Sequence, residues 1–176
     1  MINSTWEQHP YNNIRESDPH RTIALIIGTA PPPRFSNPMC REERELDFQF
    51  FYGSEDNYMW VFLEEALEQR KMLLDEMSSG ACCQIAREML ERHRLWMCDV
   101  LQQYRRKPGR ACSASDNDII PPPDAVFNDF AKVFSERPHL TGLAFTSQLA
   151  ASWTLQALES QRLIENLGEY RDRLKA

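Results

Sequence analysis

The sequence predicts an α/β protein in which short parallel strands alternate with helices. Three apolar runs, 22–28, 94–100 and 140–146, are too short for typical helices and are separated by segments with helical periodicity. Runs without polar alternation need cover on both faces, as strands of a parallel sheet do. Because a helical segment follows each run, right-handed crossovers should join the three strands into one sheet with helices on both faces.

The first apolar run ends in a sequence that suits a ligand pocket. Ile23 to Ile27 is rich in β-branched residues, and it is followed by Gly28 and by the prolines Pro31 to Pro33. Glycine lets a backbone or a ligand come close, and prolines donate no amide hydrogen and stiffen the chain. Ligands of open α/β sheets bind beyond the carboxyl ends of the strands. A tight turn without a ligand explains the same residues equally well.

Helical spacing of apolar residues marks the segments after the first strand. A helix over Tyr58 to Arg70 should face the core with Met59, Phe62, Leu63, Ala66 and Leu67. A second helix begins after Ser78-Ser79-Gly80 and should bury Cys82, Ile85, Ala86, Met89, Leu90 and His93. The second strand, Leu95 to Leu101, should then lead into a polar loop from Tyr104 to Asn117.

The triple proline after Ile120, followed by Asp124, predicts the entry to a third helix. That helix should carry Val126, Phe127, Phe130, Val133 and Phe134. The third strand is expected at Leu140 to Thr146, and the remainder, Gln148 to Leu174, is helical by period with a break near Gly168.

Length and composition bound the domain and the compartment. The 176 residues can bury one substantial core, so we expect a single domain over 21–176. Residues 1–20 are polar and without periodicity, and they should form a loose arm. No apolar run approaches the roughly 20 residues that cross a bilayer. The N-terminal region also lacks the apolar core of a secretory signal, so we expect an intracellular protein, cytoplasmic or nuclear, without membrane contact.

The cysteines fit neither a metal site nor a disulfide framework. They are five, an odd number, and no Cys-x-x-Cys pair occurs among Cys40, Cys82, Cys83, Cys98 and Cys112. We therefore expect reduced thiols, no metal and no cofactor.

A formal net charge of −6 argues against a purely electrostatic nucleic-acid binder. A basic cluster nevertheless surrounds Gly109 after the second strand, formed by Arg105, Arg106, Lys107 and Arg110. This cluster is either a local basic face for nucleic acid or a solvated loop without a ligand.

Five segments follow one another in a specific order. They are Gly28-Thr29-x-Pro31, Phe51-Tyr52-Gly53-x-x-x-Asn57-x-x-Trp60, Leu95 to Leu101 ending in Asp-Val-Leu, Lys107-Pro-Gly109 with Ser115-Asp116-x-x-Ile119, and Gly142-Leu-Ala-Phe-Thr-Ser. Together they resemble the uracil-DNA glycosylase superfamily, and within it the deoxyinosine (hypoxanthine)-DNA glycosylases and the mismatch-specific uracil/thymine-DNA glycosylases. The likeness runs from about residue 22 to residue 158.

The resemblance implies a three-layer α/β/α sandwich with a central parallel sheet. It implies a DNA glycosylase that flips a deaminated base, uracil or hypoxanthine, out of DNA and hydrolyses its N-glycosidic bond without a cofactor. We expect a monomer. The family's last strand and its Pro/Ser-rich loop are not recognisable after Ser160, which leaves open a sheet that lacks them.

The resemblance also implies site residues. Asn57 takes the place of the catalytic asparagine of the deoxyinosine-type enzymes, where an amide can hold the attacking water or stabilise the opening sugar. The flipped base would be bound by Gly28, Thr29, Pro31, Phe51 and Tyr52, with the two aromatic rings stacking on it. The substrate or the DNA backbone would be contacted by Lys107, Arg110, Ser115 and Asp116.

Structural interpretations stand beside these roles. Asn57 precedes a predicted helix and is among the best capping residues, and both roles can coexist. Asp99, at the end of the second strand, either reaches the pocket or caps a turn. Relatives commonly carry an Arg-Phe pair before the tryptophan, whereas this chain has Tyr58 and Met59. The alternative function is therefore a non-catalytic protein of this fold that binds nucleic acid or a protein partner.

Overall fold

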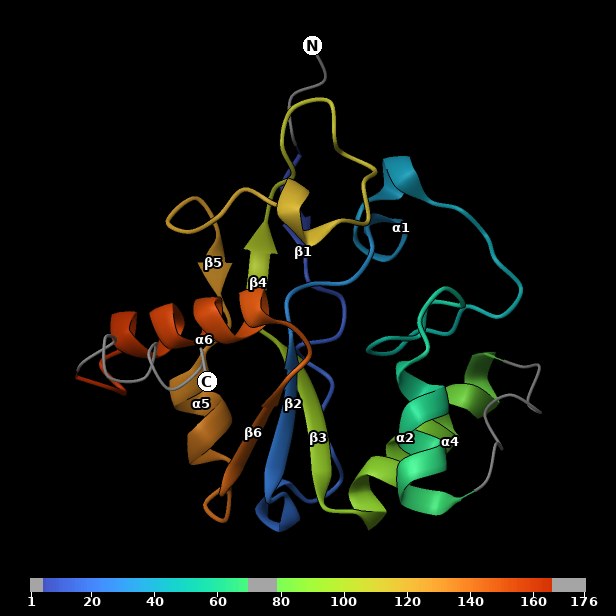
Figure 1. Ribbon diagram of the computed structural model, residues 1–176, viewed down its shortest axis with the longest axis vertical. Helices are drawn as coiled ribbons and strands as arrows, with labels where there is room; N and C mark the ends of the chain where they lie inside the picture. Colours follow the sequence, from blue (N-terminus) through green and yellow to red (C-terminus); the bar gives the residue numbers. More distant parts are fainter. Residues whose placement is uncertain (1–4, 70–78, 166–176) are drawn as a thin grey trace.

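A computed structural model of the chain describes residues 5–69 and 79–165 (Figure 1). Its α-helices are α1 (Pro33–Ser36), α2 (Met59–Glu68), α4 (Ser79–Arg92), α5 (Phe130–Ser135) and α6 (Gln148–Ser160). Its strands are β1 (Glu7–Gln8), β2 (Ala24–Gly28), β3 (Leu95–Asp99), β4 (Leu101–Tyr104), β5 (Val126–Phe127) and β6 (Gly142–Phe145). Short 3-10 turns lie at Pro19–Arg21, Pro38–Cys40 and Asp116–Asp118. The predicted helix end at Arg70 and the predicted break near Gly168 lie outside the described residues.

The central feature is a parallel sheet with the strand order β3-β2-β6. β2 pairs with β3 along its whole length, with Gly28 opposite Asp99, and it pairs with β6 up to Ile27 opposite Phe145. All three predicted strands lie in this one sheet, so the α/β prediction is confirmed. Because the strands are parallel, their carboxyl ends meet at the same edge of the sheet.

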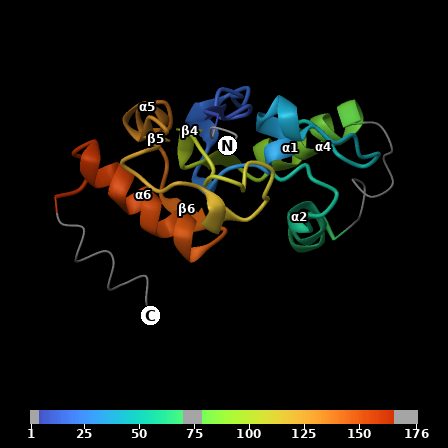
Figure 2. The ribbon, with the colours of Figure 1, turned by 90° about the horizontal axis from the view of Figure 1, so that it is seen from above.

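Helices cover the two faces of this sheet. Figure 2 shows α2 and α6 on one side of the strands and α4 and α5 on the other. α4 packs on β3, and α6 packs on both β2 and β6. The deeply buried side chains include Leu25, Ile27, Trp96 and Phe130. This arrangement is the predicted three-layer α/β/α sandwich.

β6 is the less covered of the two strands that flank β2. Leu143 is 36% exposed and Ala144 is also exposed, whereas Leu25 and Ile27 of β2 are fully buried. The expectation that every strand is covered on both faces is therefore wrong for β6. The described residues that follow α6, up to residue 165, add no fourth parallel strand beside it.

The second strand continues beyond its predicted end. After Val100, whose amide donates to the Gly28 carbonyl, the chain enters β4, which pairs antiparallel with β1 and β5. Tyr104, predicted to begin a polar loop, is fully buried. The local sequence could not reveal this extension, because the pairing partner β1 comes from the other end of the chain.

Residues 5–20 are not the loose arm that we expected. β1 pairs with β4, and His9, Tyr11 and Asn12 are buried. Glu16 forms a buried ion pair with Arg137, 2.6 Å between oxygen and nitrogen, with both side chains 2% exposed. These contacts join residues far apart in sequence, so they leave no periodic pattern within the segment itself.

Helix α2 is turned differently from its predicted orientation. Phe62 is 67% exposed, whereas Trp60 and Glu64 are the buried residues of the helix. The Trp60 ring packs on Phe48 and Phe50, and its indole nitrogen donates to the Phe51 carbonyl at 2.8 Å. These contacts fix the side of α2 that carries Trp60 toward the core. Glu64, four residues later on the same side of the helix, is buried with it.

The segment after the triple proline also differs from the prediction. Val126 and Phe127 form β5 rather than helix, and α5 starts only at Phe130, where the Asp129 side chain accepts a hydrogen bond from the Lys132 amide. α6 ends at Ser160, earlier than predicted. Arg162 follows in a left-handed conformation, φ 58°, which a continuing helix does not accept.

Candidate functional site

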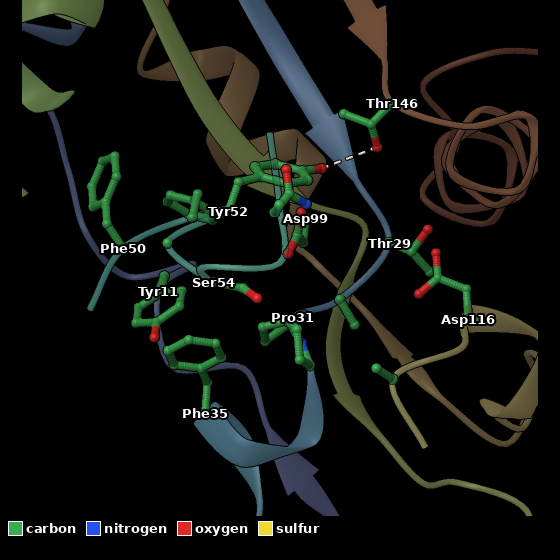
Figure 3. A pocket seen from close by; sticks show the side chains of 16 residues that line it. Tyr11, Thr29, Pro31, Phe35, Phe50, Tyr52, Ser54, Asp99, Asp116 and Thr146 are labelled. Atoms are coloured by element: carbon green, nitrogen blue, oxygen red, sulfur yellow. Dashed lines mark hydrogen bonds between the residues drawn. The ribbon is translucent and has the colours of Figure 1, made fainter. Parts of the chain in front are cut away.

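A pocket of about 330 Å³ lies at the carboxyl edge of the parallel sheet (Figure 3). Its lining comes from the N-terminal segment, the segment from the end of β2 through α1, the loop before α2, the ends of β3 and β6, and the loop after β4. The residues are Tyr11, Thr29, Ala30, Pro31, Pro32, Phe35, Phe50, Phe51, Tyr52, Gly53, Ser54, Asn57, Asp99, Ala114, Asp116 and Thr146. We call Tyr52 and Asp99, together with Gly28 against which both pack, the pocket floor, and Asn57, Ala114 and Asp116 the pocket rim.

The loop after β2, which forms one wall, is fixed by buried guanidinium groups. Arg34 makes two hydrogen bonds to the Asp47 carboxylate, at 2.6 and 2.9 Å, and a third to the Ser54 hydroxyl. Arg106 donates to the Pro31 carbonyl and pairs with Glu7 of β1 at 3.2 Å. The wall is therefore held in one shape before any ligand arrives.

Tyr52 and Gly28 fit each other closely in the floor. Tyr52 has a left-handed backbone, φ 55°, and its hydroxyl donates to the Thr146 hydroxyl at 3.0 Å. A Cβ at Gly28 would stand 1.8 Å from that tyrosine hydroxyl and 2.4 Å from Asp99 Oδ1. Only glycine leaves room for both oxygens at this strand end. Gly28 thus permits the close approach of the Tyr52 and Asp99 side chains, as the sequence suggested for a glycine at this strand end. Gly28 itself does not line the pocket.

Phe51 and Tyr52 occupy different places. Phe51 borders the pocket, but its side chain is 1% exposed and packs on His9, Tyr11 and Phe50 in an aromatic cluster. Tyr52 is only partly buried and reaches the cavity itself. Of the two rings, Tyr52 therefore has the more accessible surface for a planar ligand.

Asn57 stands at the rim, two residues before the start of α2. Tyr58, not Asn57, is the N-cap residue of α2, but Asn57 Oδ1 accepts a hydrogen bond from the Met59 amide at 2.8 Å and so supplies a partner for the first amide of the helix. The residue is exposed and also lines the pocket. With one lone pair of Oδ1 committed to the helix, the Nδ2 group is the part of the amide best able to donate to a ligand.

Asp99 and Asp116 bring two carboxyl groups to the same pocket. Asp99 is 5% exposed at the end of β3, and its Oδ2 lies 2.8 Å from His9 Nε2. Burial raises the pKa of Asp116; the nearby Thr29 hydroxyl lowers it, and the Asp99 charge raises it again. The sequence singled out Asp116 through its motif. For Asp99 the sequence left two roles open, and for His9 it suggested no role in the pocket. The reason is that their contact joins residues 90 positions apart.

The predicted basic cluster divides into buried and exposed members. Arg106 is 2% exposed and is committed to Glu7 and Pro31, so its inclusion in a solvent-facing basic face is wrong. Arg105 stacks on the Trp6 ring, 4.7 Å from its centroid. Lys107, Arg110 and Ser115 are exposed in the loop after β4, outside the pocket lining. The structure brings Asp116 into the pocket but not these three.

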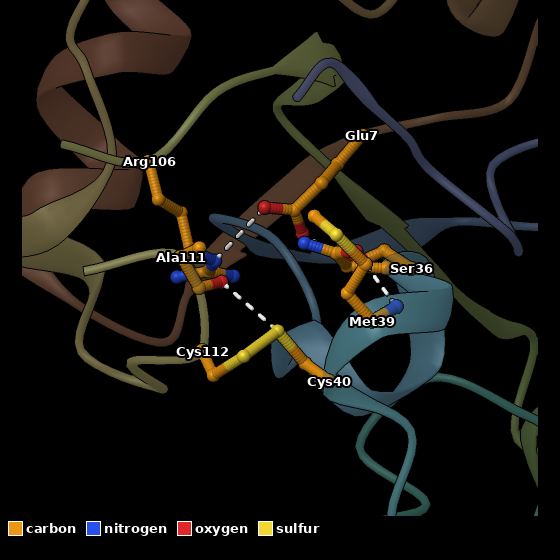
Figure 4. The surroundings of a disulfide bond; sticks show 8 residues. Glu7, Ser36, Met39, Cys40, Arg106, Ala111 and Cys112 are labelled. Atoms are coloured by element: carbon orange, nitrogen blue, oxygen red, sulfur yellow. Dashed lines mark hydrogen bonds and ion pairs between the residues drawn. A yellow bond between two sulfur atoms is a disulfide. The ribbon is translucent and has the colours of Figure 1, made fainter. Parts of the chain in front are cut away.

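A disulfide joins two loops that line the pocket. Cys40, beyond α1, is bonded to Cys112, with a Cα–Cα distance of 5.3 Å (Figure 4). The expectation of reduced thiols throughout is therefore wrong for this pair, which local spacing could not predict across 72 residues. Cys98 is a buried thiol, and burial raises its pKa to about 12.

No group of three or more His, Cys, Asp or Glu side chains among the described residues is placed to hold a metal ion. Over the same part of the chain, no helix is long and apolar enough to cross a membrane.

The architecture matches a solved structure. A solution NMR structure of a candidate uracil DNA glycosylase from Methanosarcina acetivorans superposes with a TM-score of 0.50. The match covers 81% of this chain and 72% of that one, at 20% sequence identity. The two proteins share a fold. Neither a protein-family model nor a curated protein matches the chain by sequence. At this identity the likeness establishes the uracil-DNA-glycosylase-like fold, while function has to be argued from the pocket.

Proposed function

We propose that this chain is a DNA glycosylase that binds one flipped, deaminated base in the pocket and hydrolyses its N-glycosidic bond. The observation that carries the proposal is the convergence of Asn57, Tyr52 and two carboxyl groups in one cavity at the carboxyl edge of the sheet. About 330 Å³ is at the small end of ligand pockets, roughly 300–1,000 Å³, and suits a single base. The fold shared with a candidate uracil DNA glycosylase supports the same reaction class.

The polar groups of the pocket complement a deaminated base. Uracil and hypoxanthine both present a ring carbonyl beside a ring N–H, so they need one donor and one acceptor. The Asn57 Nδ2 group supplies a donor, and the Asp116 carboxyl supplies an acceptor. Tyr52 offers the ring on which the base stacks. Within the family resemblance, Asn57 is the position that links this pocket to the deoxyinosine-type enzymes.

Asn57 acts as a fixed dipole in this proposal. Its Oδ1 bond to Met59 holds the amide in place before the substrate arrives, so no reorganisation is needed when charge develops. Lys107, Arg110 and Ser115 lie outside the pocket, where they suit contacts to the DNA backbone. Such contacts position the duplex and do not distinguish bases.

A non-catalytic binding role is the second candidate. Two observations favour it, the net charge of −6 and the exposed edge strand β6. A DNA-binding surface is typically positively charged, and an exposed apolar strand is no part of such a surface. In that case the pocket would bind a ligand without releasing a base.

The test is base release by wild-type protein and by Asn57→Ala. Wild type should produce alkali-labile abasic sites in DNA that carries uracil or hypoxanthine. Asn57→Ala should lower that rate roughly 100-fold or more, the scale for one lost preorganised donor. Binding to undamaged duplex should scarcely change, because it depends on charges rather than on a neutral amide.

The matched control is Asp129→Ala, which removes the cap of α5, a helix that contributes no residue to the pocket lining. Each variant removes a side-chain hydrogen bond at the start of a helix and should lose about 1 kcal/mol of stability, but only Asn57→Ala should lose activity. If wild type releases no base from any deaminated duplex or single strand, and both variants lose only stability, the chain is a binding protein and the glycosylase proposal fails.

A further inference from the structure

We infer that Asp99 is the catalytic residue that holds and deprotonates the attacking water, and that His9 is a positioning residue that orients it. The inference rests on the proposed function and adds the group that activates the nucleophile. Asp99 ends β3 at the pocket floor, where it lines the cavity while only 5% exposed (Figure 3). No described residue donates a hydrogen bond to its buried Oδ1.

His9 fixes the carboxylate through one tautomer. Its Nδ1 lies 3.1 Å from the Tyr11 amide and 3.0 Å from the Asn12 amide, both of which are donors. Nδ1 must therefore be the acceptor, and Nε2 carries the proton. That proton is donated to Asp99 Oδ2 at 2.8 Å, with the His9 side chain fully buried. One carboxylate oxygen is thus occupied, and the other is left for a different donor.

The backbone of Asp99 is held as firmly as its side chain. The Asn12 side chain accepts from the Asp99 amide at 2.9 Å and donates to the Asp99 carbonyl at 3.1 Å. Asn128 donates to the same carbonyl at 3.1 Å. These three bonds place Asp99 on the rigid sheet edge, which suits a group that must keep one geometry through a reaction.

The orientation of Tyr52 explains why Oδ1 has no partner. The tyrosine hydroxyl and Asp99 Oδ1 both lie against Gly28, so the hydroxyl is a near neighbour of that oxygen. It nevertheless donates to Thr146. A buried carboxylate oxygen without a donor is costly in a protein interior unless a ligand or water from the pocket meets it.

The reaction that follows uses this oxygen. The water oxygen forms a bond to C1′ of the sugar as the C1′–N bond breaks, and the bonding pair leaves with the base. One water proton passes to Asp99 Oδ1, and the released base takes a proton from solvent. Asp116 is less suited to this task, because it sits in a rim loop outside the sheet.

The experiment compares Asp99→Asn with Asp99→Ala under single-turnover conditions, with protein in excess over a uracil- or hypoxanthine-containing duplex. Asparagine keeps the shape of the side chain, so thermal stability should stay close to wild type. Base release should fall roughly 100- to 10,000-fold, the range for loss of a general base. Affinity for a duplex carrying 2′-fluorodeoxyuridine, whose glycosidic bond resists hydrolysis, should hardly change. Added formate should restore part of the rate to Asp99→Ala and none to Asp99→Asn.

His9 allows a matched pair of variants. His9→Asn places an amide oxygen near the position of Nδ1 and keeps the turn at Tyr11 and Asn12, but it loses the bond to Asp99. His9→Gln places an amide nitrogen near the position of Nε2 and keeps that bond while losing the turn. Activity should fall more in His9→Asn, and thermal stability should fall more in His9→Gln. A purely structural His9 would make activity follow stability in both variants.

The outcomes separate this inference from the proposed function. If wild type releases a base and Asp99→Asn releases it equally fast, Asp99 is structural and the inference is overturned while the glycosylase proposal stands. The same holds if formate restores no activity to a folded Asp99→Ala. If wild type releases no base at all, both fall together.

Discussion

The rim and the floor of the pocket are built in different ways. Asn57 at the rim is held by its neighbours in sequence, through a hydrogen bond from the Met59 amide two residues later. Asp99 in the floor is held by His9 and Asn12, about 90 residues away. Asn57 is exposed, whereas Asp99 is buried. A local motif can therefore identify the rim, whereas the floor exists only once the N-terminal segment has packed against β3 and β4.

Under the proposed function, the two regions have different tasks. Exposed groups at the rim would meet the substrate first, which suits recognition of a base. Groups in the floor are dry and fixed, so a charge there acts more strongly on a transition state than it would in water. We therefore expect changes to the floor to affect the reaction more than changes to the rim.

Gly28→Ala tests the floor most severely. The new methyl group would fall 1.8 Å from the Tyr52 hydroxyl and 2.4 Å from Asp99 Oδ1, so at least one of them must move. Base release should fall by about two orders of magnitude or more, and stability by about 3 kcal/mol, the upper range for overpacking. Single-turnover rates and chemical denaturation measure the two effects.

The matched control for this change is Gly142→Ala in β6. There the nearest atom to the added methyl would be Ala24 Cβ at 3.4 Å, an ordinary contact. Activity should remain close to wild type. Equal losses in the two variants would mean that general damage to the sheet, rather than a displaced floor, explains the result of Gly28→Ala.

The disulfide tests the rim. Replacing both Cys40 and Cys112 by serine removes the link between the two pocket loops and should lower stability by about 2–4 kcal/mol. The base-release rate at 25 °C should change little, because the floor is untouched. Reductant should lower the thermal midpoint of wild type and of a Cys83→Ser control, which keeps the bond, but not that of the double variant. A wild-type midpoint that ignores reductant would contradict the presence of the bond.

Asp116→Asn should have the smallest effect on stability, and its sign depends on pH. Burial raises the pKa of this carboxyl above its unfolded value. Its protonated form thus favours the native state below the unfolded pKa, and this contribution is lost as the pH rises through the folded pKa. Asparagine should therefore raise the thermal midpoint relative to wild type at pH 7, with the difference vanishing in acid. A midpoint difference that is the same at both pH values would contradict the raised pKa.

Much of the scaffold could be predicted from the sequence. The three apolar runs became the parallel sheet because a fully apolar strand has few other stable environments. The Gly28 turn and the Tyr52 to Asn57 motif were recognised locally, and their residues surround one cavity. The structure supports their proximity, while their roles remain proposals.

The missed features share one physical cause. β1, the Glu16–Arg137 pair, the Cys40–Cys112 bond and the His9–Asp99 contact each join distant parts of the chain. A hydrogen bond or ion pair across such a distance leaves no period and no spacing to detect. One sequence signal was present but weak: His9 and Asn12 are polar residues in a segment rich in turn formers, where they looked solvent-exposed.

The most direct test of this account compares Asp99→Asn with Asn57→Ala on one duplex. Base release would be measured at saturating protein, so that differences in DNA binding do not enter. The account predicts that both variants are slower than wild type, and that the floor variant Asp99→Asn is the slower of the two. If the rate of base release falls as much or more in Asn57→Ala, the rim contributes more to the reaction than the floor does. The assignment of the chemistry to Asp99 and His9 would then be wrong.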